Sequence, residues 1–218
     1  MIAADTSRSL IYFEELIKYK LIPNYVLLML NDEQNPLPGK KNRKSLDQIK
    51  KILVSADVSF DVSFNSDINS QEIVDTLSSR HESTFIYSGF GGVLVKSNIL
   101  SLGKEFLHIH GGYLPDYKGS TTNYFSLIEE NMMGASSIFL TKEIDCGPVL
   151  IRRKYSAPVD RSEIDHTHDS KLRAKVLIET LQKYIKKGSF DFELESNVGG
   201  DTYYIIHPVL KHLAIMSE

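Results

Sequence analysis

Apolar and polar positions alternate along the chain in blocks typical of strands and helices that follow one another. Two continuous apolar runs predict strands buried on both faces, and two segments of alternating apolar and polar residues also predict strands. The predicted strands are 25–30, 58–64, 84–87 and 106–110, and the helices between them are 45–54, 69–80 and 93–102. This order predicts an α/β fold with a doubly wound, mostly parallel sheet and right-handed crossovers.

The first residues depart from this regular pattern. Residues 1–4 are apolar but too few for a normal first strand, so this strand is expected to be nearly missing. A helix should follow residues 5–9, because Leu10, Phe13 and Leu16 recur at helical spacing. Residues 31–44 are polar, contain two prolines and end in basic side chains, which predicts a surface loop.

The second half continues with a helix at 122–131, strands at 135–141 and 149–155, and a long helix at 165–187. A closing apolar segment follows two glycines and reaches residue 215. Because no linker composition interrupts the chain, we expect one α/β domain over 1–188 with a C-terminal extension over 189–218. The extension is rich in aromatic and apolar residues, so it should pack on the domain or at a homodimer interface.

Composition narrows the class of function. The 218 residues carry a net charge of -3 and no long basic run, which argues against general nucleic-acid binding. A single cysteine, Cys146, excludes an internal disulfide and fits a reducing cytoplasm. No stretch is apolar for long enough to cross a bilayer, and no signal pattern precedes the first helix. We therefore expect a cytoplasmic enzyme with a small-molecule partner, and neither nucleic acid nor membrane.

Candidate catalytic residues occur in two segments of the chain. His108 and His110 are two apart on a predicted strand and share a face at its carboxyl end, where α/β sheets bind ligands. Asp145 precedes Cys-Gly-Pro at a turn and is expected to join them. Such a trio suits acid–base or oxyanion chemistry. It could instead be a buried structural pair beside a backbone-satisfied histidine, or a two-histidine, one-carboxylate metal site of a hydrolase. Lys118, next to Gly119, is interpreted as a solvated loop charge.

Three blocks resemble the folate-dependent formyltransferase family, which includes methionyl-tRNA, glycinamide-ribonucleotide and nucleotide-sugar formyltransferases. They are Tyr-Ser-Gly-Phe-Gly-Gly-Val-Leu at 87–94, His-Ile-His-Gly-Gly-Tyr-Leu-Pro-Asp-Tyr-Lys-Gly at 108–119 and Ile-Asp-Cys-Gly-Pro-Val-Leu at 144–150. The second block is similar to Asn-Ile-His-Pro-Ser-Leu-Leu-Pro-x-x-x-Gly in the family. His108 therefore replaces an asparagine, and Gly111-Gly112 replaces a Pro-Ser pair.

The resemblance implies a Rossmann-like formyltransferase fold and an N-formyltransferase that uses 10-formyltetrahydrofolate and needs no metal. It implies His110, Asp145 and His108 as catalytic residues, with both histidines donating to the oxyanion. The implied cofactor-binding residues are Phe90, Gly91, Gly92, Val93, Leu94, Leu140, Thr141 and Glu143. By elimination within the family, the acceptor is expected to be an amino sugar on a nucleotide or glycan precursor. A non-catalytic formyl-folate-binding homologue is the remaining alternative.

Overall fold

The computed structural model describes residues 1–31, 43–190 and 196–217. The chain divides into two compact units, an N-terminal unit over Met1–Leu107 and a C-terminal unit over His108–Glu218. The boundary expected between residues 188 and 189 stays a prediction. Of the predicted loop at 31–44, residues 32–42 lie outside the described part of the chain.

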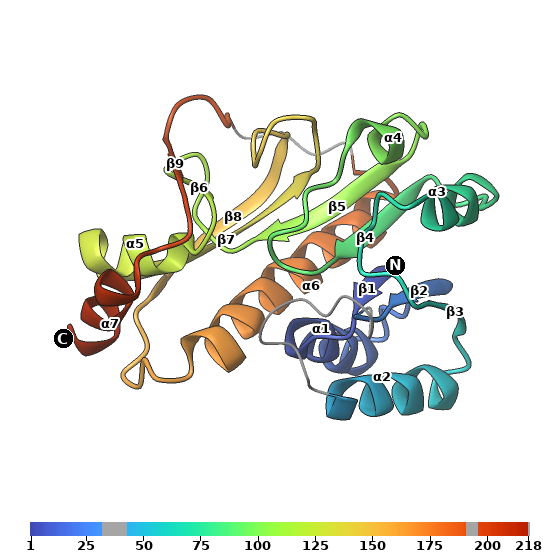
Figure 1. The fold of residues 1–218 in the computed structure, drawn as a ribbon, viewed down its shortest axis with the longest axis horizontal. Helices are drawn as coiled ribbons and strands as arrows, with labels where there is room; N and C mark the ends of the chain where they lie inside the picture. Colours follow the sequence, from blue (N-terminus) through green and yellow to red (C-terminus); the bar gives the residue numbers. More distant parts are fainter. Residues whose placement is uncertain (32–42, 191–195, 218) are drawn as a thin grey trace. The chain divides into compact units, whose positions relative to one another are not determined.

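The N-terminal unit alternates short strands with helices (Figure 1). Its elements are β1 (Ile2–Ala4), α1 (Ser7–Lys18), β2 (Tyr25–Met29), α2 (Arg43–Ser55), β3 (Ser59–Ser63), α3 (Gln71–Ser78), β4 (Thr84–Ser88), α4 (Ser97–Leu100) and the start of β5 (Glu105–His110). The predicted strands and helices are therefore present, although α4 is much shorter than the helix predicted at 93–102.

The first strand is short but complete. β1 pairs in parallel with β2 on one side and with β4 on the other, and all three of its residues are buried. The expectation that it is nearly missing is therefore wrong: three residues suffice because neighbours on both sides complete their hydrogen bonds. After it, α1 begins where Thr6 accepts a hydrogen bond from the amide of Ser9 (3.2 Å).

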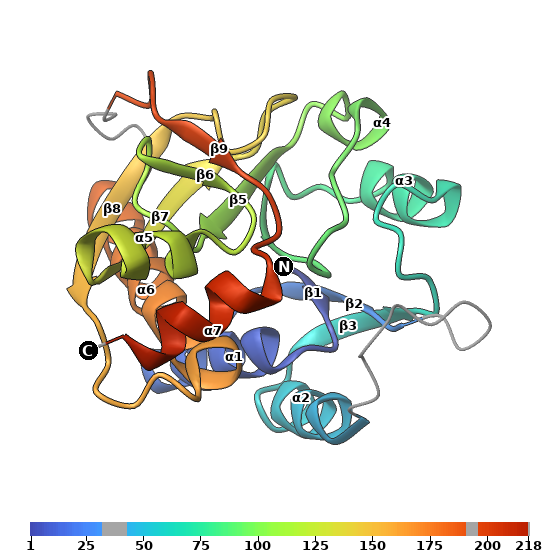
Figure 2. The same ribbon diagram turned by 60° about the vertical axis from the view of Figure 1, so that its left-hand side comes forward.

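The C-terminal unit holds the remaining elements (Figure 2). They are the end of β5, β6 (Tyr117–Gly119), α5 (Thr122–Glu130), β7 (Met132–Phe139), β8 (Val149–Ser156), the π-helical turn η1 (Ile164–His168), α6 (Asp169–Lys187), β9 (Asp201–Tyr203) and α7 (Pro208–Met216). The helix predicted at 165–187 is thus divided into η1 and α6. The sequence pattern did not predict β6, which pairs in parallel with β9 as a separate two-stranded sheet.

Hydrogen bonds connect the other strands in the order β3-β2-β1-β4-β5-β7-β8. The pairs β1–β2, β1–β4 and β2–β3 are parallel, whereas β7 and β8 are antiparallel. This mixed, mostly parallel seven-stranded sheet confirms the predicted α/β class. β7 is buried at every position from Met133 to Ile138, and α5 and α6 both pack against it. A strand covered on both faces is the arrangement that continuous apolar runs predict.

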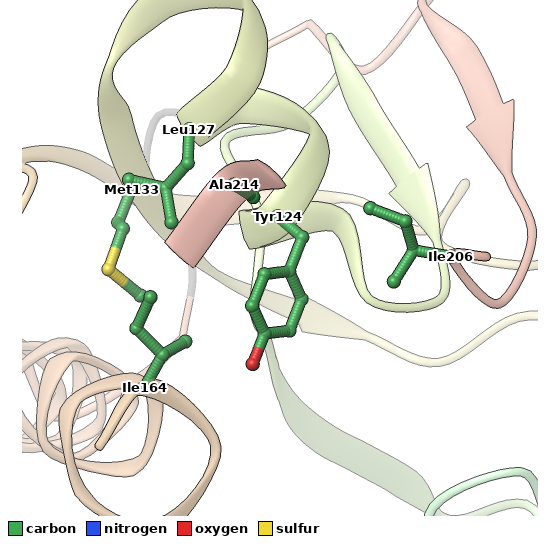
Figure 3. Close-up of a cluster of buried hydrophobic side chains, with 6 residues drawn as sticks. All are labelled: Tyr124, Leu127, Met133, Ile164, Ile206 and Ala214. Atoms are coloured by element: carbon green, nitrogen blue, oxygen red, sulfur yellow. The ribbon is translucent and has the colours of Figure 1, made fainter. Parts of the chain in front are cut away.

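The end of the chain packs on the C-terminal unit. Figure 3 shows one buried cluster formed by Tyr124, Leu127, Met133, Ile164, Ile206 and Ala214. Ile206 and Ala214 come from the C-terminal segment, and Tyr124 and Leu127 come from α5. Burying such side chains stabilises the contact by roughly 1.5–3 kcal/mol for each large one. Among the described residues, no helix combines the length and apolar character needed to cross a membrane.

Candidate active site

His110 and Asp145 are far apart in sequence and lie together in the C-terminal unit. His110 ends β5, and its Nδ1 lies 3.3 Å from Oδ2 of Asp145, which belongs to the connection between β7 and β8. The imidazole is 5% exposed and the carboxylate 10% exposed. The convergence expected for these two side chains is therefore present in the structure. Their catalytic roles remain predictions.

The Asp145 carboxylate has a second contact that fixes its direction. Its Oδ2 accepts a hydrogen bond from the amide of Gly119 at 2.8 Å. The main chain of Asp145 has a φ of 53°, in the left-handed region that residues with a side chain other than asparagine and aspartate rarely adopt. The same oxygen therefore faces the ring of His110 and the main chain of β6, so Asp145 links these two segments.

The other ring nitrogen of His110 also has a partner. Nε2 lies 2.7 Å from the main-chain oxygen of Tyr117. A carbonyl oxygen only accepts hydrogen bonds, so Nε2 must carry the hydrogen of this contact. The imidazole thus has an oxygen atom near each nitrogen, which holds its orientation. The Nε2 hydrogen of His110 is therefore bound to the Tyr117 carbonyl in this structure.

Two glycines make room for this arrangement. A Cβ on Gly112 would lie 2.6 Å from His110 Nε2, 2.6 Å from the Tyr117 oxygen and 2.8 Å from Thr122 Oγ1. A Cβ on Gly111 would overlap the guanidinium of Arg173 and lie 2.6 Å from Asp169 Oδ1. The contact between His110 and Tyr117 therefore requires a glycine at 112, whereas a side chain at 111 would require Arg173 and Asp169 to move.

A network of buried and partly buried polar groups contacts the end of β5. Arg173 donates to the Ile109 carbonyl at 3.1 Å, and its Nε lies 2.7 Å from Asp169 Oδ2. Asn123 donates to Asp169 Oδ1 at 2.8 Å and accepts from the Gly134 amide at 2.7 Å. This network joins α6, α5 and β7 to the strand that carries His110. A hydrogen bond to a charged group contributes about 1.5–3 kcal/mol, so the strand end is firmly held.

His108 lies two residues earlier on β5 and is half-buried. The alternation of side chains along a strand puts it on the same face as His110, as expected. Among the described residues, no three histidine, cysteine, aspartate or glutamate side chains are placed to share a metal ion. His108, His110 and Asp145 therefore do not form the three-ligand set on which the hydrolase alternative depends.

The expected cofactor residues of the N-terminal unit follow β4. Phe90 is buried, Gly91 and Gly92 are exposed, Val93 is half-buried, and Leu94 is 58% exposed. Just before them, Arg8 donates to the Gly89 carbonyl, and a Cβ on Gly89 would overlap the ring of Tyr87. The loop after β4 is therefore tightly packed at its start, at Gly89. Gly91 and Gly92, further along the loop, are accessible and allow a flat ligand to approach the backbone closely.

The expected cofactor residues of the C-terminal unit follow β7. Leu140 packs against a small apolar cluster of Leu114, Ile138 and Val149. Thr141 and Glu143 are exposed, and Thr141 Oγ1 donates to the Glu143 carbonyl at 3.3 Å. These residues belong to the same connection as Asp145. Their binding role stays a prediction.

The structure corrects one expectation and adds residues that the sequence did not reveal. Lys118 is 6% exposed and donates to the carbonyls of Asn197 (3.2 Å) and Gly199 (2.7 Å), so it is not a solvated loop charge. Asn197 in turn donates to the Asp145 and Gly147 carbonyls. In the sequence around Asn197, only the two glycines at 199–200 suggested a particular structure. They indicated a turn and not a contact with Asp145.

One cavity of the C-terminal unit lies elsewhere. It has a volume of about 710 Å³ and is lined by residues of the α5–β7 junction, the segment after β8 and the end of α7, among them Arg161 and Met216. None of the candidate catalytic or cofactor residues lines it. We therefore do not assign the candidate chemistry to this cavity.

No family model matches the chain, but curated proteins and solved structures do. The methionyl-tRNA formyltransferase of Lactiplantibacillus plantarum is 24% identical over 178 residues, which cover 79% of this chain and 53% of that protein. The corresponding enzyme of Finegoldia magna is 22% identical over 183 residues, which cover 81% of this chain and 57% of that protein. The chain thus spans about half the length of the curated relatives it matches.

Solved structures show the same fold. A sugar N-formyltransferase from a Shewanella species matches with a TM-score of 0.60 and 15% identity, over 99% of this chain and 85% of that one. An N-formyltransferase from Helicobacter canadensis, solved with folinic acid and dTDP-3-aminofucose, matches with a TM-score of 0.60 and 14% identity, over 93% of this chain and 69% of that one. The chain is thus distantly similar in sequence to methionyl-tRNA formyltransferases, and it shares the fold of the formyltransferase structures that it matches.

Proposed function

We propose that the chain is an N-formyltransferase that moves a formyl group from 10-formyltetrahydrofolate to the primary amine of a small molecule. The observation that carries the proposal is the contact between His110 and Asp145 (3.3 Å), which joins two of the three blocks that resemble the family. Distant similarity to methionyl-tRNA formyltransferases and the fold of sugar N-formyltransferases support the same reaction class.

The reaction is an acyl transfer. The amine nitrogen attacks the formyl carbon, and a tetrahedral intermediate with a negatively charged oxygen forms. The bond from that carbon to N10 of the folate then breaks, while a proton leaves the attacking nitrogen and another reaches N10. Catalysis requires hydrogen-bond donors for the oxyanion, each worth about 3 kcal/mol of the barrier, and a route for the protons.

His110 is proposed to supply the first donor. Its Nε2 hydrogen is bound to the Tyr117 carbonyl, so the oxyanion must replace that carbonyl as acceptor. One hydrogen bond is exchanged for a stronger, charge-assisted one, which makes the exchange favourable once the negative charge develops. Asp145 keeps the ring oriented through Nδ1 during the exchange.

His108 is proposed to supply the second donor, in place of the asparagine that the family has there. It shares the face of His110 on β5, and an imidazole N–H donates as an amide does. Cofactor-binding residues are proposed in each unit separately, after β4 in the N-terminal unit and after β7 in the C-terminal unit. The residues concerned are Phe90, Gly91, Gly92, Val93, Leu94, Leu140, Thr141 and Glu143.

For the acceptor, we propose an amino sugar carried on a nucleotide. The match to a sugar N-formyltransferase that covers 99% of this chain and 85% of the other supports this class. The match to methionyl-tRNA formyltransferases covers about half of those proteins, so their acceptor is less well supported. We also propose a homodimer, because Ile205 (78% exposed), Val209 (60%) and Leu213 (55%) expose apolar surface on the C-terminal segment.

The test is a transfer assay with radiolabelled 10-formyltetrahydrofolate and a panel of amines. The panel contains thymidine- and uridine-diphosphate amino sugars, their free sugars and methionyl-tRNA. We expect label on at least one nucleotide-linked amino sugar and little on the others. Transfer only to methionyl-tRNA would contradict the acceptor class.

Calorimetry with 5-formyltetrahydrofolate, a stable analogue of the donor, completes the test. Binding of the analogue without transfer to any amine would identify a non-catalytic homologue. Absence of both binding and transfer would contradict the proposed function as a whole.

A further inference from the structure

The Asp145 main chain is held by a side chain from the end of the molecule. Asn197 Nδ2 donates to the carbonyl of Asp145 at 2.8 Å and to that of Gly147 at 2.7 Å. Its two amide hydrogens therefore bind one carbonyl on each side of Cys146. An aspartate in the left-handed region is strained and persists only where its surroundings hold it in that conformation. The two hydrogen bonds from Asn197 hold the turn of Asp145 in this conformation.

The orientation of the Asn197 amide is fixed by chemistry. A flipped amide would set its oxygen against two carbonyl oxygens, which can only repel it. In the orientation observed, Oδ1 is buried and accepts no hydrogen bond within the described residues. A buried acceptor without a hydrogen bond is destabilising, and the two hydrogen bonds that the amide donates offset this loss. The side chain is thus placed for its two contacts with the Asp145 turn.

Asn197 belongs to a strap, residues 196–203, that is fixed to the other side of the site. Lys118 binds the carbonyls of Asn197 and Gly199, and β9 pairs with β6. Lys118 lies between Tyr117, whose carbonyl contacts His110, and Gly119, whose amide donates to Asp145. β6 and β9 lie side by side in Figures 1 and 2.

Just beyond the strap, the chain is anchored in the core by Ile206. The amide of Ile206 donates to Thr121 Oγ1 at 2.9 Å, and its side chain lies in the buried cluster of Figure 3. Within the strap, Gly200 has a φ of 71°, and a Cβ there would overlap the Pro115 carbonyl. The strap therefore approaches the loop after His110 closely and has little freedom to shift.

We propose that Asn197 is a positioning residue for Asp145, and through it for His110. The strap couples the turn of Asp145 to β6, so the carboxylate, the Gly119 amide and the Tyr117 carbonyl keep one geometry around the imidazole. The catalytic consequence rests on the formyl transfer proposed above. The structural consequence does not depend on that function.

The structural arm compares Asn197→Ala and the isosteric Asn197→Asp with the wild type by NMR, without substrate. The reporters are hydrogen exchange at the Gly119 amide, which donates to Asp145, and the ring nitrogen signals of His110. We expect about tenfold faster exchange or more in both variants, and changed His110 signals. The control is Thr76→Ala, which removes a hydrogen bond of 2.8 Å to the Glu72 carbonyl in α3 and should leave both reporters unchanged.

The catalytic arm measures kcat and KM of the same variants with the amine found in the transfer assay. We expect kcat to fall by roughly tenfold to a hundredfold with KM for both substrates unchanged, since misplacement by about 1 Å has such an effect. An unchanged Gly119 exchange rate with unchanged His110 signals would overturn the inference, as would a rise in KM alone. If the wild type transfers no formyl group, the proposed function fails while the NMR arm still decides the positioning role.

Discussion

The main-chain oxygen of Tyr117 binds Nε2 of His110 at 2.7 Å, while Asp145 faces the other nitrogen of the same ring. The imidazole is thus oriented by two segments that are far apart in sequence. The orientation of the His110 ring depends on the position of the Tyr117 carbonyl as much as on the Asp145 carboxylate. Changes that move the Tyr117 carbonyl should affect the site even when His110 and Asp145 are intact.

Gly112→Ala tests this relationship directly. The added Cβ would lie 2.6 Å from both His110 Nε2 and the Tyr117 oxygen, too close for either to stay in place. We expect kcat for formyl transfer to fall about a hundredfold, because small misplacements of catalytic groups have effects of this size. The measurement is steady-state kinetics with the best amine acceptor.

The matched control is Asp116→Ala, which adds no volume and changes an exposed side chain of the same loop. This variant should keep kcat within about twofold of the wild type, as surface substitutions usually do little. Equal rates for Gly112→Ala and the wild type would show that the contact between His110 and Tyr117 is not needed for catalysis.

Two replacements of His108 show whether this residue stabilises the oxyanion in addition to His110. His108→Asn restores the residue that the family has at this position and keeps a side-chain N–H donor. His108→Ala removes the donor, which should lower kcat by about 10²–10³-fold if His108 stabilises the oxyanion. We expect the asparagine variant to keep kcat within about tenfold of the wild type. Similar rates for the alanine variant and the wild type would restrict the oxyanion role to His110.

Metal removal distinguishes the reaction from that of a hydrolase. The described residues contain no group of three potential ligands that could share a metal ion. We therefore expect formyl transfer to be unchanged after dialysis against a strong chelator, with metal content followed by mass spectrometry. Loss of activity with a stoichiometric metal, and recovery on its return, would favour a metal-dependent mechanism.

The N-terminal unit allows a prediction of pH-dependent stability. Two hydrogen bonds from Arg80 (2.6 and 3.0 Å) lower the pKa of Glu82 from its usual 4.5 to about 2. A lowered carboxyl pKa stabilises the fold above the usual value, and this contribution is lost as pH falls towards 2. Both side chains are partly exposed, so Glu82→Gln should lower the free energy of unfolding at pH 7 by about 1 kcal/mol.

Urea unfolding at pH 7, 5 and 3 measures this difference, which should shrink as the pH falls. The control is Glu15→Gln, because Glu15 pairs with the more exposed Lys18 on the surface of α1 and should contribute less. A Glu82→Gln effect of the same size at pH 3 and pH 7 would show that the ion pair is not its source.

Much of the fold follows from local sequence patterns. The apolar run that begins at Tyr25 gives β2, and the buried stripe around Phe13 and Leu16 gives α1, since burial and hydrophobic period agree there. β1 was underestimated because a three-residue strand shows too little pattern on its own. Its stability comes from β2 and β4 on either side, which are distant in sequence.

The candidate site was predictable only in part. His110 and Asp145 could be predicted as site residues, because a histidine at the end of a predicted strand and an aspartate at a turn are typical of active sites in α/β folds. The contacts of Tyr117, Gly119 and Asn197 use main-chain atoms or a single amide, and nothing in a sequence marks a backbone carbonyl as a ligand. Lys118 was misjudged for the same reason: its partners are carbonyl oxygens of the strap, 79 and 81 residues further along the chain.

The most direct test of the central claim is the rate of formyl transfer from 10-formyltetrahydrofolate by His110→Ala. Circular dichroism and binding of 5-formyltetrahydrofolate serve as checks that the variant is folded and retains the donor site. We expect kcat to fall by at least about 10³-fold while both checks match the wild type. A variant that still transfers the formyl group at a rate near that of the wild type would contradict the assignment of His110 as the residue on which this chemistry depends.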